Sequence, residues 1–251
     1  MPAPLVSVIT PCLNASAYIG DCLDSVLAQS LDDWEHIIVD DGSTDDSFAI
    51  AADRASGDKR IRLYRHENNR GVGAARNHAL RSARGRYIAF LDADDLWLSE
   101  KLSVQIGMMR ENNWAFSFTN YGIIDARGND IKDHVNIPSC MRYRDMLRNT
   151  AIGCLTVVID SSQVMNISMP EESIARQDYV LWCRIMKSGF DAHGIDRVLA
   201  KYRVLDSSRS RNKLDAARRM WIFYRRYEYL NPVLSSWYFL NYVVNAFRKY
   251  Y

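Results

Sequence analysis

The chain has 251 residues, of which 48% are hydrophobic, enough for the core of one large domain or two small ones. Its 32 basic and 30 acidic residues leave a net charge of +2, so nothing in the overall charge indicates a partner nucleic acid or an acidic disordered tail. The five cysteines include no Cys-x-x-Cys pair, and the N-terminus lacks the pattern of a secretory signal. We therefore expect a globular cytoplasmic protein with reduced thiols.

Short β-branched runs alternate with amphipathic stretches over the first hundred residues. Strands are predicted at 5–10, 34–40, 61–66 and 86–92, with helices between them at 15–29, 45–55 and 71–83. This alternation predicts an α/β fold with βαβ units and a mostly parallel central sheet flanked by helices. Open sheets of this kind bind ligands at the carboxyl ends of their strands, so the residues that follow each strand are the candidates for function.

The pattern becomes less regular after residue 99. A helix is predicted at 99–112, short strands near 114–125 and 155–160, and a further helix at 175–188. Residues 214–251 are rich in arginine and aromatic residues and form two predicted amphipathic helices separated at Pro232, of which the second is too short and too polar to span a bilayer. Two interpretations stay open: an interfacial pair of helices on an anionic membrane, or a hairpin packed on the domain or on a second subunit of a homodimer.

Acidic side chains follow two of the predicted strands. Asp40 and Asp41 end the strand in "IIVDDGSTDDS", where Gly42 permits a tight turn and the next residues can cap a helix. In "YIAFLDADDLW", Asp92 and Asp94 flank the small Ala93, and alternation along an extended chain would point both carboxylates to one side. Crowded carboxylates of this kind suit a divalent cation, Mn²⁺ or Mg²⁺, that shares its shell with substrate phosphates.

Two glycines open the predicted helix at 71–83. "GVGAAR" does not fit a dinucleotide-binding fingerprint, because Arg76 takes the place of the third glycine and the segment follows the third strand. One interpretation is that Gly71 and Gly73 let the backbone approach a ligand while Arg76 reaches the same cleft. The other is a plain glycine turn with a solvated arginine.

The helix at 175–188 has an apolar stripe formed by Leu181, Trp182, Ile185 and Met186. Asp178 lies three and four residues before Leu181 and Trp182, so it shares their inward face in the first turn. Read from this segment alone, Asp178 is best explained as a helix cap at the positive end of the helix.

Taken together, "VSVITPCLNASAYIGDCLDSVLAQSLDDWEHIIVDDGSTDDS", "NNRGVGAARNHALRSARGRYIAFLDADDLW" and "ARQDYVLWCRI" resemble the family 2 glycosyltransferases, which have the GT-A fold. The likeness covers residues 5–205, and the later segments are similar to bacterial transferases that build teichuronic acid, capsule or O-antigen. The resemblance implies a nucleotide-sugar-binding half at 1–98, an acceptor-binding half of the same domain at 99–213, and a C-terminal helical extension at 214–251.

By resemblance, the chain transfers a hexose with inversion from a nucleotide-diphospho sugar, expected to be a UDP-sugar, to a glycan or a polyprenyl-diphosphate-linked acceptor. Asp94 and Asp92 would hold the cation on the diphosphate. The residues expected to contact the nucleotide sugar are Thr10, Pro11, Asn14, Asp40, Asp41, Arg76, Asp92, Ala93 and Arg203. The enzyme would act in the cytoplasm or peripherally on the inner face of the cell membrane.

The resemblance also gives Asp178 a role that replaces the cap interpretation. In the family the general base is the aspartate of a Glu-Asp pair that opens a helix, and Gln177 and Asp178 occupy these positions here. Gln177 and Trp182 would lie on the acceptor side. The histidine that relatives carry after the last strand is absent, and the basic loop at 203–213 either closes over the diphosphate or is simply solvated.

Two other classes of protein fit single motifs. A nucleotidyltransferase would need a basic residue near the triphosphate, and the loop "PCLNASAY" after the first strand has none. A receiver-like binding module explains Asp40 and Asp41 but leaves the acids at 92–95 and the segment around Asp178 without a function.

Overall fold

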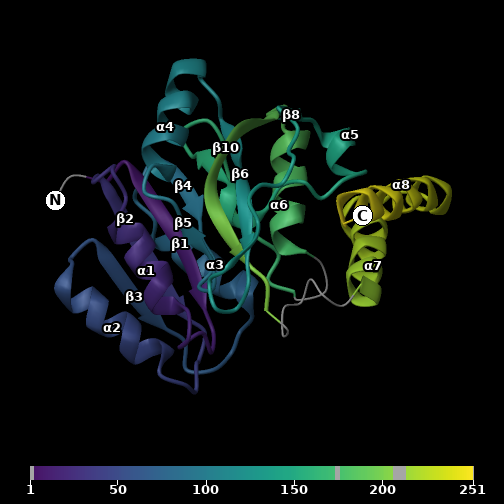
Figure 1. Cartoon of the computed structure of the whole chain (residues 1–251). Coiled ribbons are helices and arrows are strands. Elements are labelled where there is room, and N and C mark those ends of the chain that lie inside the picture. Colours follow the sequence, from purple (N-terminus) through teal and green to yellow (C-terminus); the bar gives the residue numbers. More distant parts are fainter. Residues whose placement is uncertain (1–2, 173–175, 206–212, 251) are drawn as a thin grey trace.

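One mixed sheet forms the centre of the computed structural model, which describes residues 3–172, 176–205 and 213–250 (Figure 1). The strands follow one another across it in the order β3-β2-β1-β4-β9-β6-β10-β5, while β7 pairs with β6 and β8 with β10. Their bounds are β1 (Val6–Cys12), β2 (Trp34–Asp40), β3 (Ile61–Arg65), β4 (Tyr87–Phe90), β5 (Leu96–Trp97), β6 (Phe116–Ile124), β7 (Asp130–Lys132), β8 (Cys140–Met141), β9 (Val158–Asp160) and β10 (Ala192–Arg203).

Parallel pairing is concentrated in the N-terminal half of the sheet. Strands β3, β2, β1 and β4 are parallel to one another, as the βαβ pattern predicts. Strand β9 is antiparallel to both of its neighbours, β4 and β6, whereas β6 and β10 are parallel again. The carboxyl ends of β1, β2, β4, β6 and β10 therefore lie at the same edge of the sheet, and the candidate residues of both halves can meet there.

Helices cover both faces of this sheet (Figure 1). They are α1 (Ile19–Leu27), α2 (Ser47–Gly57), α3 (Val72–Ser82), α4 (Lys101–Asn112), α5 (Tyr143–Met146) and α6 (Gln177–Lys187), with a 3-10 turn at Cys154–Thr156. Neighbouring strand residues point to opposite faces, so Ile9 packs in one apolar cluster with α3 and α6 while Val8 packs in the other with α1 and α4. Two separate cores therefore fix α3 and α6 on the same side of the sheet.

The C-terminal helices lie beside α5 and α6, at the side of the domain (Figure 1). Helix α7 (Lys213–Ile222) continues as a π-helix (Phe223–Tyr227), and α8 (Pro232–Tyr250) begins at the proline that was expected to separate two helices. The Tyr224 hydroxyl donates a hydrogen bond to the Leu147 carbonyl oxygen, 2.7 Å away, and anchors the π-helix on the domain. Within the described ranges, no helix is long and apolar enough to cross a membrane.

Candidate active site

The acids that follow β4 form a tight turn. The Asp95 backbone N–H donates a hydrogen bond to the Asp92 carbonyl oxygen, 3.1 Å away, so the expectation of an extended chain at this point is wrong. The turn still brings the carboxylates of Asp92 and Asp94 close to each other. Burial, together with the charge of Asp92, raises the pKa of Asp94 to about 6, as expected for carboxylates that need a cation between them.

Arg203, at the end of β10, is bound to the backbone of this turn. Its Nε donates to the Asp94 carbonyl oxygen at 2.8 Å, its backbone N–H donates to the Asp95 carboxylate at 2.8 Å, and its Nη1 reaches the carbonyl oxygens of Asp125 and Ala126 at 3.4 Å. The residue is only 2% exposed. The structure therefore places Arg203 behind the acidic turn, where it orients Asp94, rather than in contact with a diphosphate. The rest of that expected basic loop, at 206–212, lies outside the described residues.

Arg76 lies in the second turn of α3 and points at the acidic turn. Its Nη2 forms an ion pair with Asp92 Oδ1 at 2.5 Å, and its side chain is 7% exposed. Burial alone would lower the pKa of this guanidinium, but the nearby carboxylates of Asp92 and Asp178 raise it above its usual value. Arg76 is therefore a buried cation with an acid from each half of the chain beside it, not a solvated arginine.

Asp178 is the second residue of α6. Residue Arg176 occupies the N-cap position, and no side chain caps this end, so Asp178 does not have the capping role that the isolated segment suggests. Its carboxylate accepts no hydrogen bond from the part of the chain that the structure describes. It lies close enough to Arg76 and Cys154 to shift the pKa of both, as Asp92 does. The candidate base Asp178 and Asp92 of the acidic turn therefore lie around the same two side chains, those of Arg76 and Cys154.

Cys154 was not anticipated from the sequence. It begins the 3-10 turn and is 8% exposed, with burial raising the pKa of its thiol well above the usual value and with Arg76, Asp92 and Asp178 among its charged neighbours. Nothing in "IGCLTVVID" distinguishes this cysteine from a core residue, because its surroundings come from three other elements. Both Asp92 of the acidic turn and the candidate base Asp178 are therefore near enough to influence this thiol.

The segment before α6 is held on α3 by Asn77 and Gly73. Asn77 Nδ2 donates to the Met169 carbonyl oxygen, and Met169 N–H donates to Asn77 Oδ1, both at 2.8 Å. A Cβ on Gly73 would lie 2.3 Å from the Pro170 carbonyl oxygen and 3.0 Å from Gln177 Nε2. Gly73 thus accommodates the chain's own backbone, which corrects the interpretation that the glycine makes room for a ligand. Gly71 has a φ of 94°, which favours glycine at the start of α3.

The two acids at the end of β2 have different surroundings. Asp41 accepts hydrogen bonds from His66 Nδ1 at 2.7 Å and from the backbone N–H groups of Arg70 and Gly71 at 2.9 and 2.8 Å, so it fixes the loop that enters α3. Asp40 is fully buried; its Oδ2 is 3.2 Å from Arg65 Nε, while its Oδ1 has no partner within the described part of the chain. Both carboxylates therefore lie below the surface of the candidate site.

The candidates at the end of β1 also differ in accessibility. Thr10 is fully buried, and its hydroxyl is 2.8 Å from His36 Nε2. Pro11 is buried as well. Asn14 is exposed, and its Oδ1 accepts a hydrogen bond from Thr44 N–H at 2.9 Å, which joins the loop after β1 to the loop after β2. Of these three residues, only Asn14 presents its side chain to solvent.

The two acceptor-side candidates lie below the surface. Trp182 is fully buried and packs with Phe90 and Phe116, its ring centroid 5.4 Å from each of theirs. The structure therefore places Trp182 in the core and not on an acceptor-facing surface, because the apolar stripe of α6 points at the sheet. Gln177 is 5% exposed, and its Nε2 donates to the Glu172 carbonyl oxygen at 3.4 Å.

Asp92 and Asp94 are the residues that can hold a divalent cation. Both are partly exposed, whereas Ala93 between them is 6% exposed. No group of three or more histidine, cysteine or acidic side chains with metal-binding geometry occurs in the described ranges. Two neighbouring, partly exposed carboxylates fit Mn²⁺ or Mg²⁺, which complete their shell with water and phosphate oxygens.

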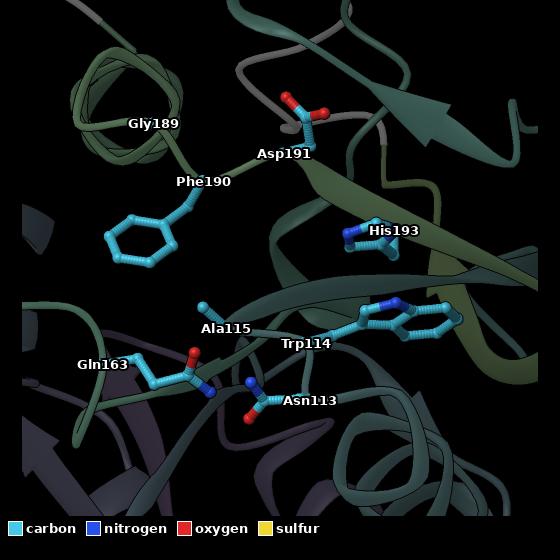
Figure 2. Close-up of a pocket in the computed structure, with 8 residues that line it drawn as sticks. All are labelled: Asn113, Trp114, Ala115, Gln163, Gly189, Phe190, Asp191 and His193. Carbon is cyan, nitrogen blue, oxygen red and sulfur yellow. The ribbon is translucent and has the colours of Figure 1, made fainter.

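A hollow of about 230 Å³ lies at the opposite end of the sheet, near the start of β6 and β10 (Figure 2). Its wall includes the rings of Trp114 and His193, stacked face to face with centroids 4.5 Å apart. Asn113 and Gln163 contribute polar groups. None of the acids described above lines it, so it is separate from the candidate active site.

Solved structures define the class of protein. The chain superposes on the crystal structure of S. aureus TarS 1–349 in complex with UDP-GlcNAc with a TM-score of 0.72 and 18% identity, over 97% of this chain and 72% of that chain. It superposes on the mannosyltransferase PcManGT from Pyrobaculum calidifontis in complex with GDP-Man and Mn²⁺ with a TM-score of 0.70 and 18% identity, over 97% and 74% of the two chains. The fold is that of the GT-A glycosyltransferases.

Sequence relatives give the family. Residues 7–164 match the sequence model described as Glycosyl transferase family 2, and the chain belongs to this family. It is 45% identical to the putative teichuronic acid biosynthesis glycosyltransferase TuaG of Bacillus subtilis, over 98% of this chain and 97% of that protein. It is 38% identical to the UDP-Glc:alpha-D-GlcNAc-diphosphoundecaprenol beta-1,3-glucosyltransferase WfgD of Escherichia coli, over 98% and 95%. The resemblance to surface-polysaccharide transferases is confirmed, and the nucleotidyltransferase and receiver-module alternatives lose their support.

Proposed function

We propose that this family 2 glycosyltransferase moves a hexose, with inversion, from a UDP-sugar to a glycan or lipid-diphosphate-linked acceptor in the synthesis of a bacterial surface polysaccharide. The observation that carries the proposal is the position of Asp178 and Asp92, one from each half of the chain, around Arg76 and Cys154. The Escherichia coli relative WfgD, a UDP-Glc:alpha-D-GlcNAc-diphosphoundecaprenol glucosyltransferase, supports the acceptor class, and TuaG, of teichuronic acid biosynthesis, supports the role in a surface polysaccharide. The UDP-GlcNAc complex of a neighbour with the same fold is consistent with a UDP-sugar donor.

Asp178 is the proposed general base. An acceptor hydroxyl is a weak nucleophile, and a carboxylate oxygen on the face of the sugar opposite the leaving group can take its proton as the new bond forms at the anomeric carbon. The absence of a capping role leaves this carboxylate available. Asp178 lies in the first turn of α6, where the positive end of the helix dipole favours a negative charge.

Asp94 and Asp92 are proposed to hold Mn²⁺ or Mg²⁺ on the diphosphate. When bound, the ion neutralises negative charge on the departing nucleotide, and it binds the transition state more tightly than the ground state. Arg203 keeps the Asp94 backbone in position through its bond to the carbonyl oxygen. Arg76 holds the Asp92 carboxylate in position through their ion pair.

The test is UDP release with Mn²⁺ from a panel of UDP-sugars, with and without a diphosphate-linked acceptor. Asp178→Asn should bind the donor normally and transfer at least about a hundredfold more slowly, because a general base typically contributes 10²–10⁴-fold. Asp53→Asn, at a carboxylate that is 74% exposed and far from the site, is the matched control. If Asp178→Asn transferred at the wild-type rate, another residue would be the base.

A second variant separates the metal from the base. Asp94→Ala should abolish the Mn²⁺ dependence of donor binding, measured by titration calorimetry with the UDP-sugar, whereas Asp178→Asn should retain it. Donor binding by Asp94→Ala that still responds to Mn²⁺ as in the wild type would place the metal elsewhere.

A further inference from the structure

Helix α8 has apolar side chains on two opposite faces. On the inner face, Tyr238, Phe239 and Tyr242 pack against the core cluster that contains α6. Four apolar residues follow one another at intervals of four, three and four, which places them along a single stripe of a helix. These four residues are all exposed: Val233 by 78%, Trp237 by 57%, Leu240 by 61% and Val244 by 43%. The helix therefore presents a continuous apolar stripe to solvent on the side facing away from the domain.

The outer side of α7 combines apolar and basic residues. Leu214 is 85% exposed, and Trp221, seven residues later, is 38% exposed, with its ring packed edge-on against Phe239 of α8. Arg218 lies on the same stripe by its spacing and is exposed. Arg225 is also exposed, in the π-helix, where its Nη1 donates a hydrogen bond to the Leu230 carbonyl oxygen. A tryptophan and a leucine beside arginines are the composition of helices that lie in the interface of an anionic membrane.

The charge of this segment differs in sign from that of the rest of the chain. Residues 214–251 hold six of the 32 basic residues and two of the 30 acidic residues, so their formal charge is +4 and that of the remaining chain is −2. Two copies meeting through a two-fold axis on the outer side of these helices would bring the exposed Arg218 and Arg225 of each copy together, which is unfavourable. A surface of anionic lipid complements it instead.

We propose that α7 and α8 bind an anionic lipid bilayer, with Trp237 and Leu240 at the centre of the contact and Arg218 and Arg225 toward the lipid phosphates. The helices lie on the surface, in agreement with the finding that no described helix can cross a membrane. The surface formed by Leu214, Arg218, Trp221, Arg225 and the α8 stripe is called the docking face below.

On the side opposite the docking face, the C-terminal helices contact residues next to the candidate base Asp178. The Phe223 ring packs edge-on against Tyr179, with centroids 4.7 Å apart, and Tyr179 directly follows Asp178. Arg226 forms an ion pair of 3.1 Å with Glu172, in the segment that precedes α6. Binding to a bilayer would therefore hold the acceptor side of the site at a fixed orientation to lipid, which serves the lipid-linked acceptor of the proposed function.

Vesicle sedimentation of the full chain, without donor or acceptor, tests this proposal. The wild type should sediment with vesicles of equal parts phosphatidylcholine and phosphatidylglycerol, less so in high salt, and should stay in solution with phosphatidylcholine alone. Trp237→Glu combined with Leu240→Glu should reduce the bound fraction by about tenfold or more, since both changes place charge in the apolar stripe. Met165→Glu, at an apolar residue that is 84% exposed elsewhere, should bind as the wild type does.

Three results would overturn the proposal. The wild type could fail to sediment with the anionic vesicles, or the double variant could sediment as well as the wild type. The wild type could also fail to bind vesicles and be a dimer by light scattering while the double variant is a monomer. A second copy would then be the occupant of the docking face. Because no sugar transfer is measured, these results are independent of the proposed base and metal. A normal melting temperature and normal donor binding would show that the double variant is folded.

Discussion

Replacing Gly73 with alanine tests whether the contact between α3 and the segment before α6 positions the base. The added Cβ would lie 2.3 Å from the Pro170 carbonyl oxygen, where ordinary contacts begin at 3.4 Å, and 3.0 Å from Gln177 Nε2. The Gln177 amide ends a flexible side chain and can move aside, but the Pro170 carbonyl belongs to the backbone, and the preceding Met169 is tied to Asn77 by two hydrogen bonds. The segment leading to Asp178 must therefore retreat from α3.

The size of the effect follows from the geometry. Restoring an ordinary contact requires a displacement of about 1 Å, and a misplacement of this size in a catalytic group costs on the order of a hundredfold in rate. We expect the kcat of sugar transfer by Gly73→Ala to fall by about this factor. Donor binding should persist, because Arg203 holds the acidic turn and His66 holds Asp41, and neither bond involves Pro170.

The assay is UDP release with saturating donor and acceptor, together with donor binding and thermal unfolding. Gly107→Ala is the matched control: Gly107 is also in a helix, nothing lies within 4 Å of the position of its Cβ, and the change should stabilise the fold by about 1 kcal/mol without affecting transfer. A Gly73→Ala enzyme with the wild-type kcat would show that the position of this segment does not control the base.

Two further variants report on the buried groups behind the site. Burial lowers the pKa of His36 to about 3, so the unfolded chain takes up a proton that the folded chain does not, and this contribution to stability is lost as pH falls below the ordinary value of 6.5. The unfolding free energy of each protein is measured by urea denaturation at about pH 7.5 and at about pH 5. The wild type should lose about 2 kcal/mol more between these two pH values than His36→Gln does. Equal losses would mean that His36 takes up a proton in the folded chain as well. Arg203→Lys should lower the unfolding free energy by about 2 kcal/mol, because lysine cannot reproduce the guanidinium bonds to the carbonyl oxygens of Asp94, Asp125 and Ala126. The change should also weaken Mn²⁺-dependent donor binding; unchanged Mn²⁺ affinity would exclude a role in positioning Asp94.

The order of elements in the first half of the chain was predictable because its causes are local. A continuous apolar run is typical of a strand covered on both faces: Val8 and Ile9 point to opposite faces of β1, and β2 and β4 are buried throughout in the same way. The antiparallel pairing of β9 between β4 and β6 was not predicted, since three residues carry too little pattern to show which neighbours they will have.

The identities of the site residues were more accessible from sequence than their roles. The acids at 92–95 stand out as a cluster of like charges, but the turn that brings Asp92 and Asp94 together depends on a backbone hydrogen bond that no residue type requires. Arg203 and Trp182 were assigned to ligand contact because arginine and tryptophan often serve it. Both are buried by elements distant in sequence, and spacing along the chain carries no information on those contacts.

The pair of hydrogen bonds between Asn77 and Met169 joins a part of the chain that matches the family sequence model, residues 7–164, to a part beyond it. A chimaeric enzyme that keeps the first part and takes the remainder from a relative with another acceptor has to preserve this junction. We expect such chimaeras to fold with the base in its correct position only where the segment taken from the relative has a backbone that can pair with Asn77 and fit against Gly73.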